Sequence, residues 1–131
     1  MIQGVNDTSI FIAAERGRDI NQELLPNIAY LTVITLAELK VGLLNAPNPE
    51  LAARRLDTLT ALSLLDALPV TDSVASKWAV MAANLNRAKR KININDLWIA
   101  AIALDNGLPV FSRDGDYDVI AEYGGPESIR V

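Results

Sequence analysis

Residues 95–114 of the chain read NDLWIAAIALDNGLPVFSRD and carry three successive structural signals. The initial Asn-Asp pair can begin a helix, residues 97–105 are apolar on nearly all sides, and the following Asn-Gly pair is a typical helix end. Residues 108–111 are a short apolar run, typical of a buried strand, and Asp114 follows them. A helix that is apolar all round is expected between two layers of structure. The segment therefore predicts an inner helix leading into a strand that has an acidic residue just beyond its end.

The same alternation of strands and helices extends to both ends of the chain. Strands are predicted at residues 2–6, 29–33 and 128–131, and helices at residues 8–15, 50–65 and 73–91. Another helix is predicted to start at a capping box, Thr35-Leu-Ala-Glu38, and to end near residue 45. Residues 69–70 are expected in a short strand or connector, residues 113–118 in an acidic loop, and the last strand at a sheet edge. We expect one α/β domain over residues 1–131, built as three α/β/α layers with a mostly parallel central sheet flanked by helices.

The composition excludes several kinds of chemistry. The chain of 131 residues has no cysteine, so it has no disulfide, zinc–thiolate site or thiol nucleophile. It also has no histidine, which removes imidazole as a base, as a zinc ligand and as a partner for serine. Half of the residues are hydrophobic, yet no apolar run reaches the roughly 18 residues that span a bilayer, so we expect a cytoplasmic protein without a membrane partner. If the chain is a hydrolase, carboxylates or metal ions must act in it.

Four acidic residues stand at equivalent places, just beyond predicted strands or at predicted helix starts: Asp7, Glu38, Asp96 and Asp114. Helix capping is a sufficient explanation for any one of them. Taken together they predict a site, because right-handed crossovers bring the carboxyl ends of parallel strands to one edge of the sheet. Carboxylates that converge there would raise one another's pKa or require a cation. Oxygen ligands without histidine or cysteine favour Mg²⁺ or Mn²⁺ over zinc, and such ions can promote phosphodiester hydrolysis.

Four segments contain these acids. In chain order they read VNDTSIFI (residues 5–12), TLAELKVG (35–42), INDLWIAA (94–101) and SRDGDY (112–117). They resemble, in the same order, the four acidic motifs of the PIN-domain VapC toxins of bacterial toxin–antitoxin pairs. Each motif alone is a weak signal, but the four together span nearly the whole chain and are a strong one.

The resemblance implies a role for each motif residue. The catalytic acids would be Asp7, Glu38, Asp96 and Asp114, the metal ligands would be Asp7, Asp96, Asp114 and Asp116, and the supporting polar residues would be Thr8 and Ser112. It further implies Mg²⁺-dependent cleavage of RNA. Our mechanistic hypothesis is that the four catalytic acids position one or two Mg²⁺, for which Mn²⁺ can substitute, and that an activated water attacks the phosphorus in line without a covalent intermediate. The resemblance also implies a homodimer and a cognate VapB antitoxin whose tail covers the site.

One residue departs from the family pattern. The position before the first motif acid is usually apolar, as a buried parallel strand requires, and here it is Asn6. Asn6 could form a hydrogen bond near the site, or the first strand could be strained or weakly paired.

The charge of the chain bears on an RNA substrate. A formal net charge of −4 weakly disfavours a nucleic-acid partner, although part of this charge is the site itself, which bound cations would neutralise. Candidate RNA-binding residues are Arg87, Lys89, Arg90 and Lys91 before the third motif and Arg113 in the fourth. Arg16 and Arg18, after the first predicted helix, could also flank the acids. A solvated basic helix end explains the cluster at residues 87–91 equally well.

Three alternative interpretations use the same residues. A calcium loop from Asp114 fails because Val119 stands where glycine is needed and Gly125 where a bidentate acid is needed. A response-regulator phosphoacceptor domain needs adjacent acids after the first strand and a lysine after a late strand, and this chain offers only one acid and an arginine there. The third alternative is a non-enzymatic interaction domain whose acids are only helix caps.

Overall fold

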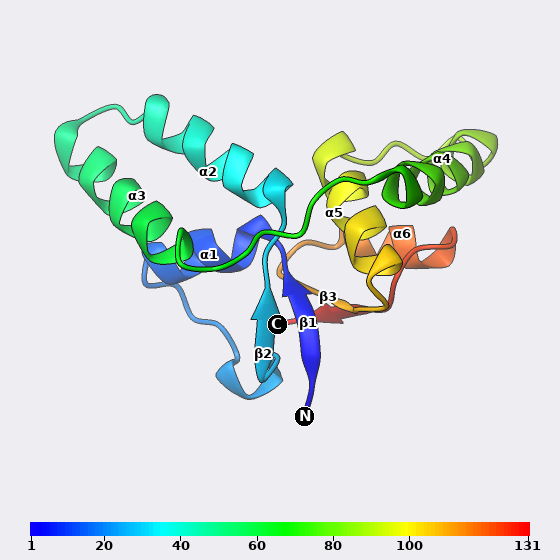
Figure 1. Ribbon diagram of the computed structural model, residues 1–131, viewed down its shortest axis with the longest axis horizontal. Coiled ribbons are helices and arrows are strands. Elements are labelled where there is room, and N and C mark those ends of the chain that lie inside the picture. The colour runs from blue at the N-terminus through cyan, green and yellow to red at the C-terminus, as the bar shows by residue number, and fades with distance from the viewer.

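The computed structural model describes all 131 residues and contains a four-stranded sheet with a group of helices on either side (Figure 1). The strands are β1 (Gln3–Asn6), β2 (Ile28–Tyr30), β3 (Val110–Ser112) and β4 (Ser128–Arg130). Their order in the sheet is β2-β1-β3-β4, and every neighbouring pair is parallel. The predicted three-layer α/β fold is confirmed, with a sheet that is wholly rather than mostly parallel and with the last strand at an edge.

The helices form two groups. They are α1 (Thr8–Glu15), α2 (Val33–Leu44), α3 (Pro49–Leu62), α4 (Asp72–Arg87), α5 (Ile94–Asp105) and α6 (Asp116–Glu122), with a short 3-10 helix η1 (Gln22–Leu24). Helices α1, α2 and α3 contact one another, and α5 contacts both α4 and α6 (Figure 1). None of the helices has the length and apolar character needed to cross a membrane.

The sheet order explains why the helices lie on opposite sides. The chain leaves β1 through α1 toward β2, and it then returns past β1 to β3 and β4 in the opposite direction. Right-handed crossovers that run in opposite directions along a sheet place their helices on opposite faces. Helix α1 therefore covers one face, and α5 and α6 cover the other. The carboxyl ends of β1 and β3 lie where the direction changes, which is the place where open α/β sheets bind ligands.

Helix α5 is the centre of the larger hydrophobic core. Its residues from Ile99 to Ala103 are all fully buried, as the apolar pattern of the segment predicts. The sheet contributes Val5 and Val110 to this core, and α4 and α6 pack around it. Trp98 of α5 is half-buried and stacks on a tryptophan of α4, with ring centroids 4.8 Å apart, so its role is packing.

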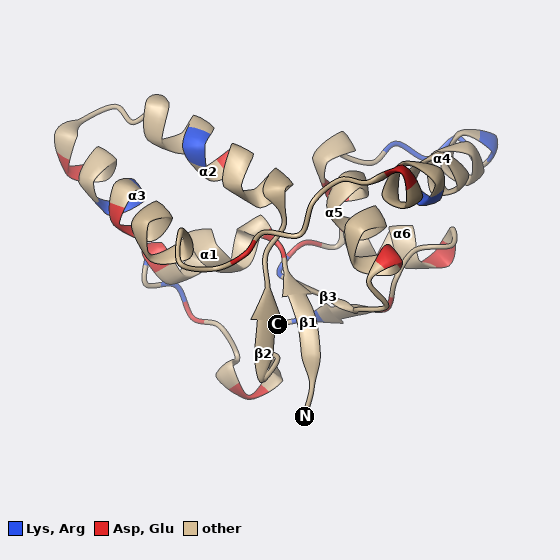
Figure 2. Ribbon diagram, in the orientation of Figure 1, with Lys and Arg blue, Asp and Glu red and all other residues tan.

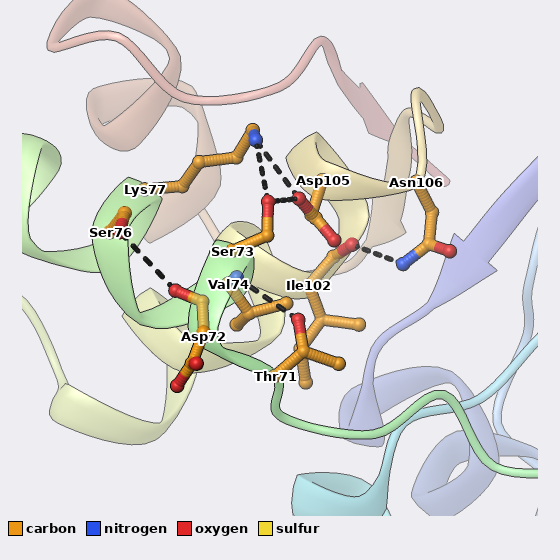
Figure 3. A network of polar contacts seen from close by, with 9 residues as sticks. All are labelled: Thr71, Asp72, Ser73, Val74, Ser76, Lys77, Ile102, Asp105 and Asn106. Carbon is orange, nitrogen blue, oxygen red and sulfur yellow. Dashed lines mark hydrogen bonds and ion pairs between the residues drawn. The ribbon is translucent and has the colours of Figure 1, made fainter.

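Polar contacts fix the start of α4 to the end of α5 (Figure 3). The Thr71 hydroxyl accepts a hydrogen bond from the backbone N–H of Val74 and so caps α4. Ser73 donates to the Asp105 carboxylate, and Lys77 Nζ lies 2.9 Å from Asp105 Oδ1. The Ser73 hydroxyl and the Lys77 ammonium hold the pKa of Asp105 below its ordinary value. These contacts join the start of α4 to the end of α5 and so keep the two helices in a fixed register.

Helix α2 starts earlier than the capping box predicts. Its cap is Thr32, whose hydroxyl accepts from the Thr35 backbone N–H at 3.2 Å, and the preceding strand ends at Tyr30 rather than at residue 33. Thr32 has the extended conformation that a cap requires because it forms a parallel bridge with Leu68. The proposed capping box at Thr35 and Glu38 is therefore wrong. Glu38 lies in the second turn of α2, and its carboxylate is not used to cap the helix.

Several further boundaries differ from expectation: α3 ends at Leu62 instead of residue 65, and β3 spans Val110–Ser112 instead of residues 108–111. The predicted acidic loop contains the start of α6, because Asp116 is already helical and its backbone N–H is bound by the Asp114 carboxylate at 3.0 Å. Helix α4 ends at Arg87 instead of residue 91, because Lys89 adopts a φ of +55° that a helix cannot include. Residues 69–70 form a connector.

Asn6 does not weaken the first strand. β1 is a central strand with a partner on each side, and Asn6 pairs with Phe111 of β3. The Asn6 side chain is 7% exposed, and its Oδ1 has no hydrogen-bond partner in the chain. The Asn6 side chain therefore does not form the hydrogen bond that was expected near the site. The strand is not weakly paired either, because strand pairing uses only backbone groups.

Candidate active site

Acidic residues follow the carboxyl ends of β1 and β3, and the acidic backbone segments are red in Figure 2. Asp7 directly follows β1, and its backbone N–H donates to the Phe111 carbonyl of β3 at 3.1 Å. Asp114 lies two residues beyond β3. The parallel pairing of β1 with β3 thus fixes both acids at the point where the crossover direction changes.

Three carboxylates form the tightest cluster. Oxygen atoms of Asp96, Asp114 and Asp116 all lie within 4.8 Å of one another, although the residues come from α5, from the loop after β3 and from the start of α6. Asp96 stands in the first turn of α5, but the cap there is Asn93, whose side chain accepts from the Asn95 and Asp96 backbone N–H groups. The Asp96 carboxylate is therefore available to the cluster. The arrangement has the size and the oxygen donors of a divalent cation site.

Asp7 is buried beside this cluster. Its side chain accepts a hydrogen bond of 2.6 Å from Ser9 Oγ, and only 3% of the residue is exposed. Its pKa is raised to about 6, mainly by burial and also by the charge of nearby Asp114, although hydrogen bonds from the Ser9 and Ser112 hydroxyls act to lower it. The two hydroxyl groups thus offset only part of the effect of burial on the pKa of Asp7.

Asp96 is affected more strongly. Burial is the largest cause that raises its pKa to about 8, followed by the charge of Asp114, the adjacent Asp116 carboxyl and the charge of Asp7. These carboxylates cannot all be ionised near neutral pH without a compensating positive charge. No basic side chain forms an ion pair with any of them, so the chain itself does not supply that charge.

Glu38 is held separately, on the α2 side of the site. Thr8 Oγ1 donates to Glu38 Oε1 at 2.7 Å, and the Thr35 hydroxyl, 3.0 Å from Thr8 Oγ1, donates in turn to Thr8. Thr8 is the first residue of α1, so this chain of hydrogen bonds fixes α2 to the start of α1. The Glu38 charge reaches the site, because it is among the causes that raise the pKa of Tyr117.

Two residues at the site are missing from the sequence prediction. Ser9 Oγ donates to Asp7 and accepts from the Arg113 backbone N–H at 3.1 Å, so it joins α1 to the loop after β3. Tyr117 is buried, and its hydroxyl lies 3.3 Å from Asp96 Oδ1, to which it donates. Burial, followed by the charges of Asp7 and Asp96, raises the pKa of Tyr117, so its phenol stays protonated. Tyr117 was missed because residues 113–118 were predicted to form a loop, and a loop gives no reason to expect a buried side chain.

The other expected polar and basic residues fall into two groups. Ser112 is fully buried, and its hydroxyl accepts from the Asp114 backbone N–H at 2.8 Å, beside the acids. The basic cluster at residues 87–91 is exposed at the end of α4 and in the turn after it, where Figure 2 shows blue segments of the backbone. None of its side chains forms a hydrogen bond or ion pair with the acids. Arg113 lines a pocket together with Asp114. A role of these basic residues in RNA binding stays a prediction.

The fold and the site define a class: a parallel α/β protein whose carboxylates gather at the point where the sheet changes direction. The PIN domain family model matches residues 5–123, so the chain belongs to the PIN-domain family. Curated relatives include Ribonuclease VapC5 of Mycobacterium tuberculosis, which is 44% identical over 98% of this chain and 95% of its own length. Ribonuclease VapC4 of the same organism is 38% identical over 85% of both chains.

Solved structures agree with this assignment. The crystal structure described as VapBC-5, from a VapBC family of toxin–antitoxin systems of Mycobacterium tuberculosis, matches all of this chain and all of its own with a TM-score of 0.91 and 40% identity. The structure of FitAcB from Neisseria gonorrhoeae matches 98% of this chain and 96% of its own with a TM-score of 0.75 and 26% identity. The fold is thus shared along the entire chain, not only in the acidic motifs.

Proposed function

We propose that this chain is a Mg²⁺-dependent endoribonuclease and the toxin of a VapBC-type toxin–antitoxin pair. The observation that carries the proposal is the set of carboxylate oxygens within 4.8 Å of one another at the carboxyl edge of the sheet. Relatives at 38% and 44% identity are named ribonucleases, which supports RNA as the substrate. The family assignment also favours a nuclease over a phosphoacceptor domain.

The residues present fit a hard divalent cation. All donors at the site are oxygen atoms, since the chain has neither histidine nor cysteine. Burial, followed by the charges of neighbouring carboxylates, raises the pKa of Asp7 and of Asp96, and a cation at the site would favour the charged form of both. We assign the metal to Asp7, Asp96, Asp114 and Asp116. Bound there, Mg²⁺ would supply the positive charge that activates water and stabilises the phosphodiester transition state, with Mn²⁺ able to replace it.

The protein groups around the acids hold them in place. Ser9 fixes the orientation of Asp7, and Tyr117 fixes that of Asp96. Thr8 holds one oxygen of Glu38, which we assign as a further catalytic acid. Because these side chains are already held by hydrogen bonds, little reorganisation is needed when a cation and RNA bind.

The partners follow from the relatives. Several structural neighbours are described as VapBC complexes, which supports a cognate VapB-type antitoxin for this chain. We also propose a homodimer, as in the resemblance described above.

Cleavage of RNA by the purified chain tests the proposal. End-labelled single-stranded RNA should be cut in Mg²⁺ and left intact in EDTA, and sequencing the new 5′ ends should locate the cut bonds. Asp96→Asn should abolish cleavage while the fold is retained, whereas Asp118→Asn, an exposed acid paired with Arg130, should cut normally. Equal activity in Asp96→Asn and the unmodified chain would refute the assigned role.

A saturable metal effect on stability separates the nuclease from a non-enzymatic interaction domain. If the acids form a cation site, Mn²⁺ should raise the melting temperature in a saturable way, because a ligand that binds only the folded state stabilises it. Acids that only cap helices would give no saturable increase.

A further inference from the structure

A pocket adjoins the acidic site on the side of α1. It has a volume of about 440 Å³ and lies between one face of α1 and the loop after β3. Ser9 and Ala13 line it from the helix, Arg113 and Asp114 line it from the loop, and Arg18 lines it from the segment after α1. We call it the arginine pocket, after Arg18 and Arg113.

Neither arginine has a partner in the chain. The ion pairs of the structure are Lys77 with Asp105 and Arg130 with Asp118, and no side-chain hydrogen bond involves the guanidinium of Arg18 or Arg113. Two guanidinium groups thus line one pocket without an ion-pair partner, beside the carboxylate of Asp114, which also lines it. Guanidinium groups bind phosphate strongly and often through two parallel hydrogen bonds.

The backbone fixes Arg18 at this place. Gly17 ends α1 with a φ of +65°, and the Arg18 backbone N–H donates to the Ala13 carbonyl at 2.9 Å. This is the geometry of a glycine-terminated helix, which turns the chain sharply after its last turn. Arg18 is therefore held beside the helix face instead of following a mobile loop.

The pocket is continuous with the acidic site. Ser9 lines the pocket and donates to the Asp7 carboxylate, and its hydroxyl accepts from the Arg113 backbone N–H. Asp114 belongs both to the pocket lining and to the carboxylate cluster. A strand of RNA bound at the cluster would reach the pocket with its next phosphate groups.

We propose that the arginine pocket binds a backbone phosphate of the RNA strand, next to the phosphodiester that is cleaved. The inference rests on the proposed ribonuclease function and adds to it the path of the substrate, from the acidic cluster across Ser9 toward Arg18. RNA is chosen over an acidic peptide because the relatives at 38% and 44% identity are named ribonucleases, and competition with polyglutamate distinguishes the two. One phosphate can occupy the acidic site, with its cation, while a neighbouring one meets the arginines.

Binding without cleavage tests the pocket. Every variant is placed in the Asp96→Asn background, which should not cleave, and the affinity of a short fluorescein-labelled single-stranded RNA is measured by anisotropy in Mg²⁺ over a series of salt concentrations. Arg18→Ala and Arg113→Ala should each weaken binding about tenfold at low salt and reduce the slope of log K against log salt by about 0.7, the value for one lost single-strand phosphate contact. Arg18→Lys should keep the slope, because the charge remains.

Arg54→Ala is the matched control. Arg54 is an exposed arginine of α3, outside the pocket and without a side-chain partner, so its loss changes the net charge equally. The proposal is wrong if the pocket variants bind RNA with the same affinity and slope as Arg54→Ala, or if the Asp96→Asn chain with all its arginines shows no salt-dependent binding in Mg²⁺. It is also wrong if polyglutamate of equal charge competes as well as unlabelled RNA. If the ribonuclease function itself is wrong, the unmodified chain will not cleave RNA in Mg²⁺. RNA binding could then still depend on Arg18, so the two failures can be told apart.

Discussion

At the scale of single residues, the acidic site is a place where function opposes stability. Asp7 is almost fully buried, and the shift of its pKa to about 6 from 3.8 corresponds to roughly 3 kcal/mol of unfavourable charge burial at high pH. Such a residue is not explained by folding, because a neutral side chain of the same shape would be less costly there. Its presence agrees with a role that requires a bound cation.

Asp7→Asn should therefore change activity and stability in opposite directions. The amide can still accept the hydrogen bond of Ser9 but cannot bear charge, so cleavage should fall by at least about a hundredfold. In EDTA at pH 8 the variant should be more stable than the unmodified chain by about 1–3 kcal/mol, since the buried charge is gone. Urea unfolding and an RNA cleavage assay measure the two effects. A variant that is both inactive and less stable would show that the Asp7 charge is required for folding.

Tyr117 provides a milder test of how the site is held. Tyr117→Phe keeps the buried ring and removes the hydroxyl that lies 3.3 Å from Asp96 Oδ1. Loss of a group that orients a metal ligand typically weakens metal binding by about tenfold or more, so we expect a loss of this size in Mn²⁺ affinity with little change in melting temperature. Titration of the metal followed by electron paramagnetic resonance measures the affinity. An unchanged dissociation constant would mean that Asp96 is oriented by its helix alone.

The sequence predicted the acids better than the residues that hold them. An acid just beyond a strand, such as Asp7 or Asp114, can be identified from the order of elements alone. Ser9 acts through contacts with Arg113, which is 104 residues away in the chain, and no local pattern encodes such a contact. Tyr117 could have been recognised from its spacing to buried Ile120 in a short helix, but the surrounding acids suggested a loop.

At the scale of elements, the pairing of β1 with β3 determines the geometry of the site. Gly4 of β1 leaves room for the Phe111 ring, because a Cβ atom at Gly4 would lie 2.2 Å from Phe111 Cε1. Phe111 is buried within β3, directly before Ser112, so its ring has little free space into which it can move. A close approach of this kind is a recognised reason for glycine within a strand.

Gly4→Ala should accordingly destabilise the chain by about 1–3 kcal/mol, as expected for overpacking, and should also reduce activity. Gly42→Ala is the matched control, because a Cβ there meets only Arg55 Cδ at 4.0 Å and the residue lies inside α2. The control should be neutral or more stable by up to about 1 kcal/mol, from the helix preference of alanine over glycine. Denaturant unfolding compares the two variants, and equal stability would contradict the close packing of β1 against β3.

The sequence predicted which elements exist, but not always where they begin. Helix α5 and strand β3 were recognisable because a fully apolar helix and a short apolar strand have clear patterns. The start of α2 was misplaced because Thr32 and Thr35 can each cap a helix. The choice between them depends on the bridge from Thr32 to Leu68, which is a long-range contact.

At the scale of the whole molecule, the strand order places the acids of distant segments together. β1 and β3 are adjacent although about a hundred residues separate them, so Asp7 and Asp114 come from opposite ends of the chain. The general rule for parallel sheets was sufficient to expect convergence at the carboxyl edge. It could not give the order β2-β1-β3-β4 or the register, because those depend on which apolar surfaces fit together.

The stability of the whole molecule should depend on pH and metal together. Without metal, the folded-state pKa values of Asp7 and Asp96, about 6 and about 8, both exceed the ordinary 3.8. The folded chain then binds more protons than the unfolded chain, so the free energy of unfolding should fall as the pH rises from about 4 to about 8. A divalent cation replaces these protons, so its stabilising effect should be greater at pH 8 than at pH 6. Thermal unfolding in EDTA and in saturating Mg²⁺ at both pH values measures this difference.

Asp96→Asn should reduce the difference in metal stabilisation between pH 6 and pH 8, because it removes the carboxyl with the higher pKa. An equal rise in melting temperature at pH 6 and pH 8 would mean that metal binding is not coupled to deprotonation of these acids, and the cation would then have to bind elsewhere.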